Sequence, residues 1–185
     1  MRIIGGKFRG RRLAALGKGD AGAHLRPTSD RVRESLFNVL MNAHAGQVAG
    51  ACVLDLFAGS GALGLEALSR GAAHATFVEN GRRALTLLRD NIGLCGVAER
   101  STILARDARR LGPAPRPHDL VFLDPPYGKG LGERAMQAAL AGGWLADSAL
   151  VIWEEGARII PPDGLTILDT RRYGDTTITF LTHAA

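Results

Sequence analysis

Short apolar runs alternate with helical patterns from residue 51 onward, and this alternation restricts the fold more than any other feature. The apolar runs predict buried strands at 52–57, 75–79, 101–104, 119–124 and 150–153. Helical patterns separate them at 62–70, 82–94 and 132–140. Two further strands, 165–168 and 176–181, follow one another without a helix. The pattern is typical of an α/β fold with a mostly parallel, doubly wound sheet and an antiparallel closure.

A glycine-rich segment follows the first predicted strand and begins a helix. Its letters, Gly-Ser-Gly-Ala-Leu-Gly at 59–64, match a dinucleotide-binding turn, although six residues alone are weak evidence. Asp55, just before the turn, would repel a pyrophosphate but attract an ammonium group such as that of a bound methionine. The acid therefore favours a methionine-derived cofactor over NAD. The candidate contacts are Asp55, Phe57, Ala58, Gly59, Ser60 and Gly61.

Two more acids follow neighbouring strands. Glu79 ends the second strand, where its carboxylate is placed to accept hydrogen bonds from ribose hydroxyls. Asp107 follows the third strand and would accept from an adenine amino group, or instead cap the short helix that begins at Ala108. Asn80 and Ala108 are the adjacent candidates.

Asp124-Pro125-Pro126-Tyr127 follows the fourth strand, and we call it the acceptor loop. Two prolines remove two backbone donors and leave a carboxylate and carbonyl oxygens beside an aromatic ring. Acceptors of this kind would hold both hydrogens of a flat amino group while the ring of Tyr127 stacks on its base. The loop by itself fits guanine, adenine or an inert proline-rich turn. With the Asp55 segment it predicts amino methylation, in which Asp124 to Tyr127 are catalytic.

The basic surplus lies at the start of the chain. The net charge is +5, yet residues 1–35 hold nine basic and three acidic side chains. A local surplus of this kind indicates a polyanionic partner, although a solubilising tail shares it, and charge does not separate DNA, RNA and an acidic protein. The candidate RNA contacts are Arg2, Lys7, Arg9, Arg11, Arg12, Arg31 and Arg33, with Lys129 beside the acceptor loop.

Residues 1–45 are predicted to form a basic hairpin and a helix that belong to the same domain as residues 46–185. Segments 2–4 and 11–13 would be the hairpin strands. The helix would begin near 26–30, with Thr28 or Ser29 as its N-cap, and would place Val32, Leu36, Val39 and Leu40 on one apolar face.

Several classes of protein are excluded by what the sequence lacks. No apolar stretch is long enough to cross a membrane, and the first residues do not resemble a signal peptide, so we expect a cytoplasmic protein. Cys52 and Cys95 have no CxxC partner or histidine cluster, so we expect buried thiols and no metal site. No surplus apolar helix face suggests a dimer, and a monomer is expected.

The motifs together resemble a known family. The segments 55–61 and 124–127 are similar to class I methyltransferases that act on amino groups, and the segments 2–11 and 26–38 are similar to the bacterial RsmD-type 16S rRNA guanine-N2 methyltransferases. The match is loosest at 173–180. The resemblance implies a Rossmann-like, seven-stranded class I sheet with its last strand antiparallel, S-adenosylmethionine as methyl donor, and N2 of guanine 966 in the rRNA, free or in a small-subunit assembly intermediate, as acceptor.

The resemblance also assigns roles to residues. It implies that Asp55, Gly59 and Gly61 contact the methionine part, Glu79 the ribose and Asp107 the adenine, and that the acceptor loop holds the target base. Arg26 and Thr28 would lie near the cofactor mouth.

Three rival functions stay open at this point. An adenine-N6 methyltransferase would use the same acceptor loop, but 185 residues leave little room for a DNA-recognition domain. An NAD-binding oxidoreductase would need a hydride-transfer pair that the sequence does not offer. An RNA-binding chaperone with an inactive pocket would have little use for intact Asp55 and Asp124.

Overall fold

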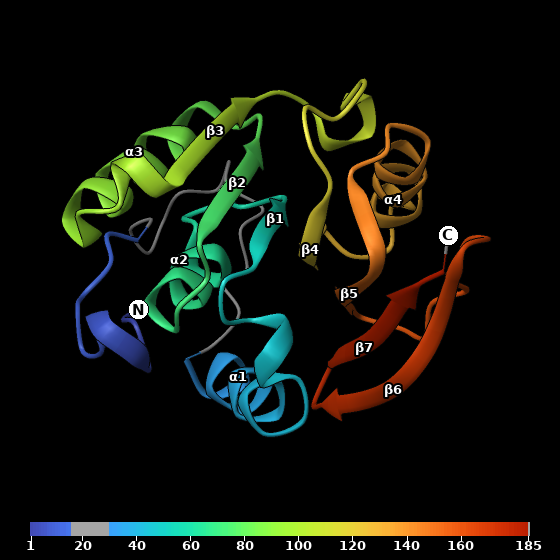
Figure 1. Ribbon diagram of the computed structural model, residues 1–185, viewed down its shortest axis with the longest axis horizontal. Helices are drawn as coiled ribbons and strands as arrows, with labels where there is room; N and C mark the ends of the chain where they lie inside the picture. The colour runs from blue at the N-terminus through green and yellow to red at the C-terminus, as the bar shows by residue number, and fades with distance from the viewer. Residues whose placement is uncertain (16–29, 185) are drawn as a thin grey trace.

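The computed structural model describes residues 1–15 and 30–184, and its centre is one seven-stranded sheet (Figure 1). The strand order is β3-β2-β1-β4-β5-β7-β6. The strands are β1 Cys52–Leu56, β2 His74–Glu79, β3 Ser101–Ala105, β4 His118–Leu123, β5 Leu145–Glu155, β6 Leu165–Tyr173 and β7 Thr176–His183. β1 to β5 pair in parallel, whereas β7 lies antiparallel between β5 and β6. The predicted mostly parallel sheet with an antiparallel closing strand is confirmed.

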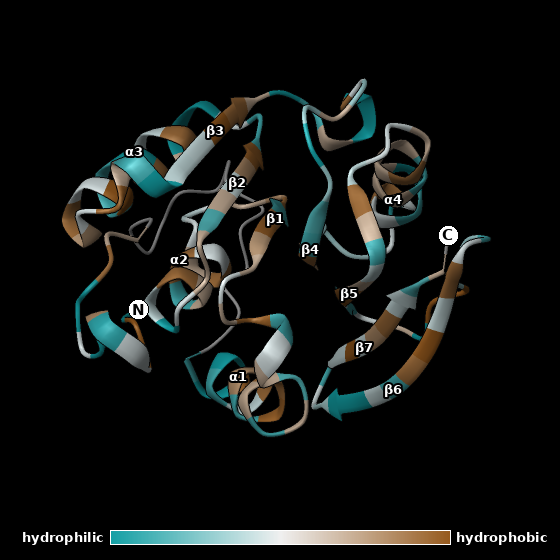
Figure 2. Cartoon of the chain, viewed as in Figure 1, coloured by the Kyte–Doolittle hydropathy of each residue, from teal (hydrophilic) through white to brown (hydrophobic). Residues whose placement is uncertain are grey.

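Helices cover both faces of the sheet. The α-helices are α1 Asp30–Ala43, α2 Ala62–Ser69, α3 Arg82–Cys95 and α4 Leu131–Ala141. The short 3-10 turns are η1 Gly6–Phe8, η2 Ala45–Gln47, η3 Ala98–Arg100 and η4 Ala108–Arg110. Apolar and polar residues share the surface of α3, as Figure 2 shows by colour, because only one side of that helix is buried.

The core has two layers, one on each side of the sheet. Successive strand residues point to opposite faces, so Val53 packs with α1, α2 and α3 while Leu54 packs with α4 and η4. β4 repeats this division, with Phe122 on the first side and Val121 on the second. This three-layer arrangement leaves the carboxyl ends of the parallel strands free to carry a site.

Two strands are longer than predicted. β5 begins at Leu145, five residues before the predicted start, and includes Ser148 at a φ of 60° where its pairing with β4 shifts register. β6 continues to Tyr173, through charged and exposed residues beyond its predicted end at Leu168. Apolar periodicity marks only the buried parts of a strand, so it missed both extensions.

The first residues differ in detail from the predicted hairpin. Arg2 and Arg12 form one isolated antiparallel bridge, and η1 lies between them in place of two strands. Ile3, Phe8 and Leu13 are buried in the core, so the segment packs firmly on the domain. α1 begins at Asp30, and the proposed caps Thr28 and Ser29 lie outside the described residues.

The buried face of α1 is also rotated from the predicted one. Leu36 and Leu40 are buried as expected, but Arg33 and Phe37 complete the face and Val32 and Val39 are only partly covered. Cys95 is buried and Cys52 is half-buried; both are free thiols. Within the described ranges, no helix has the length and apolar character needed to cross a membrane.

Candidate active site

The glycine-rich segment forms a tight turn between β1 and α2. Phe57, Gly59 and Gly61 all have positive φ values, of 61°, 56° and 80°. Glycine adopts this conformation freely, but for phenylalanine it costs on the order of 1–3 kcal/mol. Gly61 has a further constraint, because a Cβ there would lie 2.5 Å from Cδ1 of Leu88. Strain and close packing together make the turn a candidate binding site, as predicted.

Asp55 lies beneath this turn as a buried carboxylate. Asp55 is only 1% exposed, and its Oδ2 accepts a hydrogen bond from the backbone N–H of Gly64 at 2.9 Å. Burial raises the pKa of Asp55 to about 7; the Gly64 bond opposes the rise and the charge of Glu79 adds to it. No lysine or arginine in residues 1–15 and 30–184 forms an ion pair with it. A buried acid without a cation is costly, and a cationic ligand group would relieve that cost.

Glu79, at the end of β2, fastens the turn. Its Oε2 accepts from the N–H of Gly59 at 2.8 Å, and its Oε1 accepts from Asn80 at 2.8 Å and Gly81 at 2.6 Å. A carboxylate has about four acceptor positions, so one more donor can be held. Glu79 therefore organises the glycine-rich turn, and its contact with a ribose stays a prediction.

Asp107 takes the alternative role that the sequence allowed. It is the N-cap of η4, where Oδ1 accepts from the N–H of Arg109 at 2.9 Å, and its carboxylate also forms an ion pair with the Arg109 guanidinium at 2.5 Å. The Arg109 side chain, more than any other group, lowers the pKa of Asp107. Ala108 is buried. An adenine contact is untested by this geometry.

The acceptor loop begins directly after β4. The N–H of Asp124 donates to the carbonyl of Leu56 at 3.5 Å, which joins the loop to the end of β1. Asp124 is half-buried and Pro125 is buried. Asp124 therefore lies at the boundary between the core and solvent.

Tyr127 is held by residues that the sequence analysis missed. Its hydroxyl donates to Oε1 of Glu154 at 2.7 Å and lies 3.2 Å from Oγ1 of Thr176. Burial and the Glu154 carboxylate raise the pKa of the Tyr127 hydroxyl, so it stays protonated as a donor. Gly156 leaves room for the ring, because a Cβ there would lie 2.8 Å from Cδ2. The available signal was an acid at the end of the fifth strand, the same position as Asp55 and Glu79 in theirs.

The sheet brings the separate motifs to one edge. Leu56 pairs with Val78 on one side and Leu123 on the other, so β1, β2 and β4 end side by side. The glycine turn, Glu79 and the acceptor loop therefore share the carboxyl edge, where doubly wound sheets bind ligands.

The amino-terminal segment reaches the same turn through Asn91. This buried α3 residue donates to the carbonyls of Ser60 at 2.9 Å and Ala14 at 3.1 Å, and it accepts from the N–H of Ala14 at 2.7 Å. The hydroxyl of Ser60 also contacts the sulfur of Met1 at 3.8 Å. Sequence patterns gave no indication of Asn91, since it occupies the buried side of a helix as an isolated amide.

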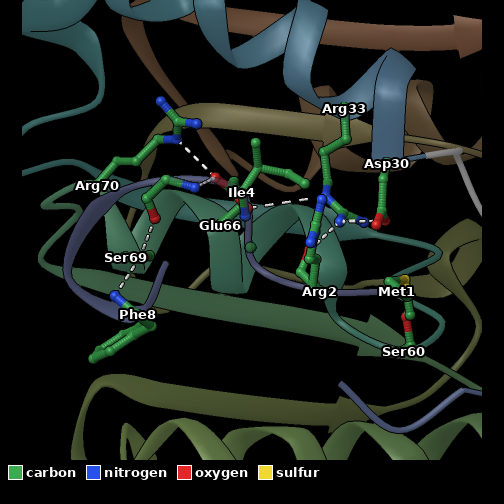
Figure 3. A network of polar contacts seen from close by, with 12 residues as sticks. Met1, Arg2, Ile4, Phe8, Asp30, Arg33, Ser60, Glu66, Ser69 and Arg70 are labelled. Carbon is green, nitrogen blue, oxygen red and sulfur yellow. Dashed lines mark hydrogen bonds and ion pairs between the residues drawn. The ribbon is translucent and has the colours of Figure 1, made fainter. Parts of the chain in front are cut away.

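One predicted RNA contact is wrong. Arg33 is 0% exposed and lies in a polar network with Arg2, Asp30 and Glu66 (Figure 3). Its guanidinium donates to Oδ1 of Asp30 at 2.9 Å and to the carbonyl of Arg2, and lies 3.9 Å from Glu66. Arg33 was predicted as a contact because of its charge. In the structure its guanidinium is buried beside Glu66 of α2, which lies far away in the sequence. The remaining candidates are exposed: Arg2, Lys7, Arg9, Arg11, Arg12, Arg31 and Lys129.

Glu66 is the centre of that network and another residue missed from the sequence. Its two carboxylate oxygens accept from the N–H groups of Ile4 and Gly5, each at 2.8 Å, and Oε1 pairs with Arg70 at 2.8 Å. The network ties the basic segment to α2, directly after the glycine turn. Arg26 and Thr28 lie outside the described residues, so their predicted place at the cofactor mouth is not addressed.

Comparisons with known proteins agree with this geometry. The family model described as Conserved hypothetical protein 95 matches residues 1–182. The Ribosomal RNA small subunit methyltransferase D of Escherichia coli (strain K12) is 44% identical over 83% of this chain and 74% of its own. The Haemophilus influenzae protein of the same name is 38% identical over 94% and 89%.

A solved structure shows the same likeness in three dimensions. The Escherichia coli protein yhhF superposes with a TM-score of 0.83 at 34% identity, over 100% of this chain and 98% of the other. The family model, the relatives and the fold thus agree over nearly the whole sequence. The chain belongs to the RsmD family, whose model is described as Conserved hypothetical protein 95, and it has the class I methyltransferase fold.

Proposed function

We propose that this chain transfers the methyl group of S-adenosylmethionine to the exocyclic N2 of a guanine in 16S rRNA. The observation that carries the proposal is the position of Asp55, a buried acid with no cation paired to it among the described residues, on the same sheet edge as the acceptor loop. An amino methyltransferase needs two binding sites, one for a positively charged cofactor and one for an amino group. Asp55 would serve the first and the acceptor loop the second.

The cofactor pocket fits the proposed donor. Asp55 and the turn from Gly59 to Gly61 would hold the methionine part, Glu79 the ribose, and Asp107 with Ala108 the adenine. The same turn would be lined by Asn80, Ser60, Ala58 and Phe57. S-adenosylmethionine supplies an electrophilic methyl group on a sulfonium centre.

The chain's own contribution to the reaction is positioning. Asp124 and the carbonyl oxygens of the acceptor loop would accept the two amino hydrogens, which leaves the nitrogen lone pair directed at the donor. Asp124 would also take up the proton that leaves after transfer. Tyr127 would stack on the base, with its hydroxyl fixed by Glu154 and Thr176. The guanine must be unpaired or flipped, because a paired amino group cannot enter the site.

The choice of RNA over DNA rests on the relatives and on charge. The relatives' names state ribosomal RNA of the small subunit as their substrate. The exposed basic residues of the amino-terminal segment would contact its phosphates and make binding depend on salt. We propose that a monomer acts on the rRNA in the cytoplasm.

Methyl transfer from labelled cofactor tests this function. Naked 16S rRNA, assembled small subunits and duplex DNA are compared as acceptors, with Asp124→Ala as the inactive control. We expect label in at least one of the two RNA substrates. Label in the DNA alone would refute the proposal and favour the adenine-N6 alternative. Calorimetry with both cofactors addresses the oxidoreductase, which requires tight NAD binding without S-adenosylmethionine binding.

A further inference from the structure

A basic depression lies between η4 and α4, outside the residues assigned so far. It has a volume of about 480 Å³, and its lining residues are Arg109, Arg110, Arg134, Gln137 and Ala138. Three guanidinium groups and one amide thus surround it, and no carboxylate is among the lining residues. The depression is therefore suited to an anion that also accepts hydrogen bonds.

The walls of the depression are fixed in place. Arg109 is paired with Asp107, and Arg134 donates to the carbonyls of Lys129 and Gly130, both at 3.0 Å. Beneath them, Ala108 of η4 belongs to the same buried core as α4. A site held in this way loses little conformational entropy when a ligand binds.

Donors remain available inside the depression. Arg110 is exposed, and within the described ranges 1–15 and 30–184 its guanidinium forms no hydrogen bond or ion pair; its backbone N–H donates to the carbonyl of Asp107. A guanidinium has five donors, so Arg109 and Arg134 also keep some after their internal bonds. Asp107 forms its ion pair with Arg109, so Arg110 and Arg134 are the two lining arginines that have no ion pair within the described residues.

The position of the depression connects it to the active site. η4 begins directly after Asp107, and α4 begins after the acceptor loop, with Arg134 bonded to the residues between them. Figure 1 shows the η4 coil beside α4. An RNA strand whose base enters the acceptor loop would carry its neighbouring phosphates past this surface.

We infer that this depression binds a phosphodiester group of the rRNA strand next to the target nucleotide. The inference rests on the proposed function and adds a contact on the opposite face of the sheet from α1, α2 and α3. A guanidinium group binds phosphate through two parallel N–H···O bonds, which adds geometric specificity to the attraction between the charges. Gln137 supplies a neutral donor and acceptor that suits a ribose hydroxyl.

The test compares two arginines in an RNA-binding assay. Arg110→Ala removes one of the two lining cations that have no ion pair within the described residues. Arg116→Ala instead removes an exposed arginine just before β4, at the opposite edge of the sheet. Binding of naked 16S rRNA is measured by fluorescence anisotropy over a range of salt concentrations. Circular dichroism verifies that both variants fold, and calorimetry verifies that their affinity for S-adenosylmethionine is unchanged.

One lost phosphate contact should flatten the plot of log K against log salt by about 0.7–0.9 and weaken binding about five- to eightfold at 0.1 M salt. We expect this for Arg110→Ala and an unchanged slope for Arg116→Ala. Equal slopes in Arg110→Ala and the wild type, or equal losses in both variants, overturn the inference. The same assay is run with assembled small subunits, and a loss of binding there without one on naked rRNA would overturn the inference and assign the depression to a ribosomal protein. Failure of the wild type to methylate any RNA refutes the proposed function instead, and the slopes still decide the phosphate contact.

Discussion

Lowering the pH from 7 to 5.5 should weaken the binding of S-adenosylmethionine by about 15-fold, because Asp55 loses its charge over that interval. The pKa of Asp55 is raised to about 7, so about half of the protein carries the carboxylate at pH 7 and about 3% at pH 5.5. The α-amino group of the cofactor, with an ordinary pKa of about 7.7–8.0, stays protonated throughout. The loss of affinity therefore comes from protonation of Asp55 and not from a change in the charge of the cofactor.

Asp55→Asn separates this effect from general changes in the protein. The amide oxygen can still accept the bond from Gly64, but it carries no charge at any pH. Isothermal titration calorimetry should give the variant weaker binding at pH 7 and a flat profile down to pH 5.5. Asp90→Asn, an exposed acid on α3, is the matched control and should keep the wild-type profile.

Two outcomes would refute the reasoning. A wild-type affinity that is independent of pH would mean that Asp55 does not pair with the cofactor ammonium. A pH dependence that survives in Asp55→Asn would assign the titration to another group.

The same raised pKa of Asp55 also lowers the free energy of unfolding as the pH rises from about 4 to 7, because the native state binds the proton more tightly than the unfolded chain does.

Three further predictions concern other residues. Asp124→Ala should lower the methyl-transfer rate by about 10²–10⁴-fold while calorimetry shows unchanged cofactor affinity; an equal loss of affinity would contradict the assigned role. Glu66→Ala should lower the free energy of unfolding by about 3–5 kcal/mol in urea titrations, because buried Arg33 keeps only Asp30 as an acid and the N–H groups of Ile4 and Gly5 lose their acceptor; a loss below 1 kcal/mol would refute this. Gly64→Ala should lower the free energy of unfolding by about 1–3 kcal/mol, because its Cβ would lie 2.4 Å from Cε1 of Phe77. Gly93→Ala has open space around it and should stabilise α3 by about 0.5–1 kcal/mol. Equal effects of the two changes would contradict the packing argument.

The motifs at strand ends could be predicted because their chemistry is local. Asp55, Glu79 and Asp124 each follow an apolar run that marks a buried strand, and parallel strands end at a common edge. Order along the chain was therefore enough to bring the three acids together. The same logic, applied to β5, would have found Glu154.

Contacts between distant segments could not be predicted in this way. Arg33 reads as a surface charge because its partner Glu66 lies 33 positions further along and the pairing depends on how α1 crosses α2. Asn91 joins Ser60 to Ala14 through a helix face that only tertiary packing defines. These residues hold the amino-terminal segment against the glycine turn and α2, and no periodicity or motif identifies them.

Identification of the methylated nucleoside tests the central claim most directly. Reacted 16S rRNA is digested to nucleosides and analysed by mass spectrometry, with Asp124→Ala protein as the control. The account predicts N2-methylguanosine that the wild type forms and the variant does not. N6-methyladenosine in its place, or a methylated product formed equally by the variant, would contradict it.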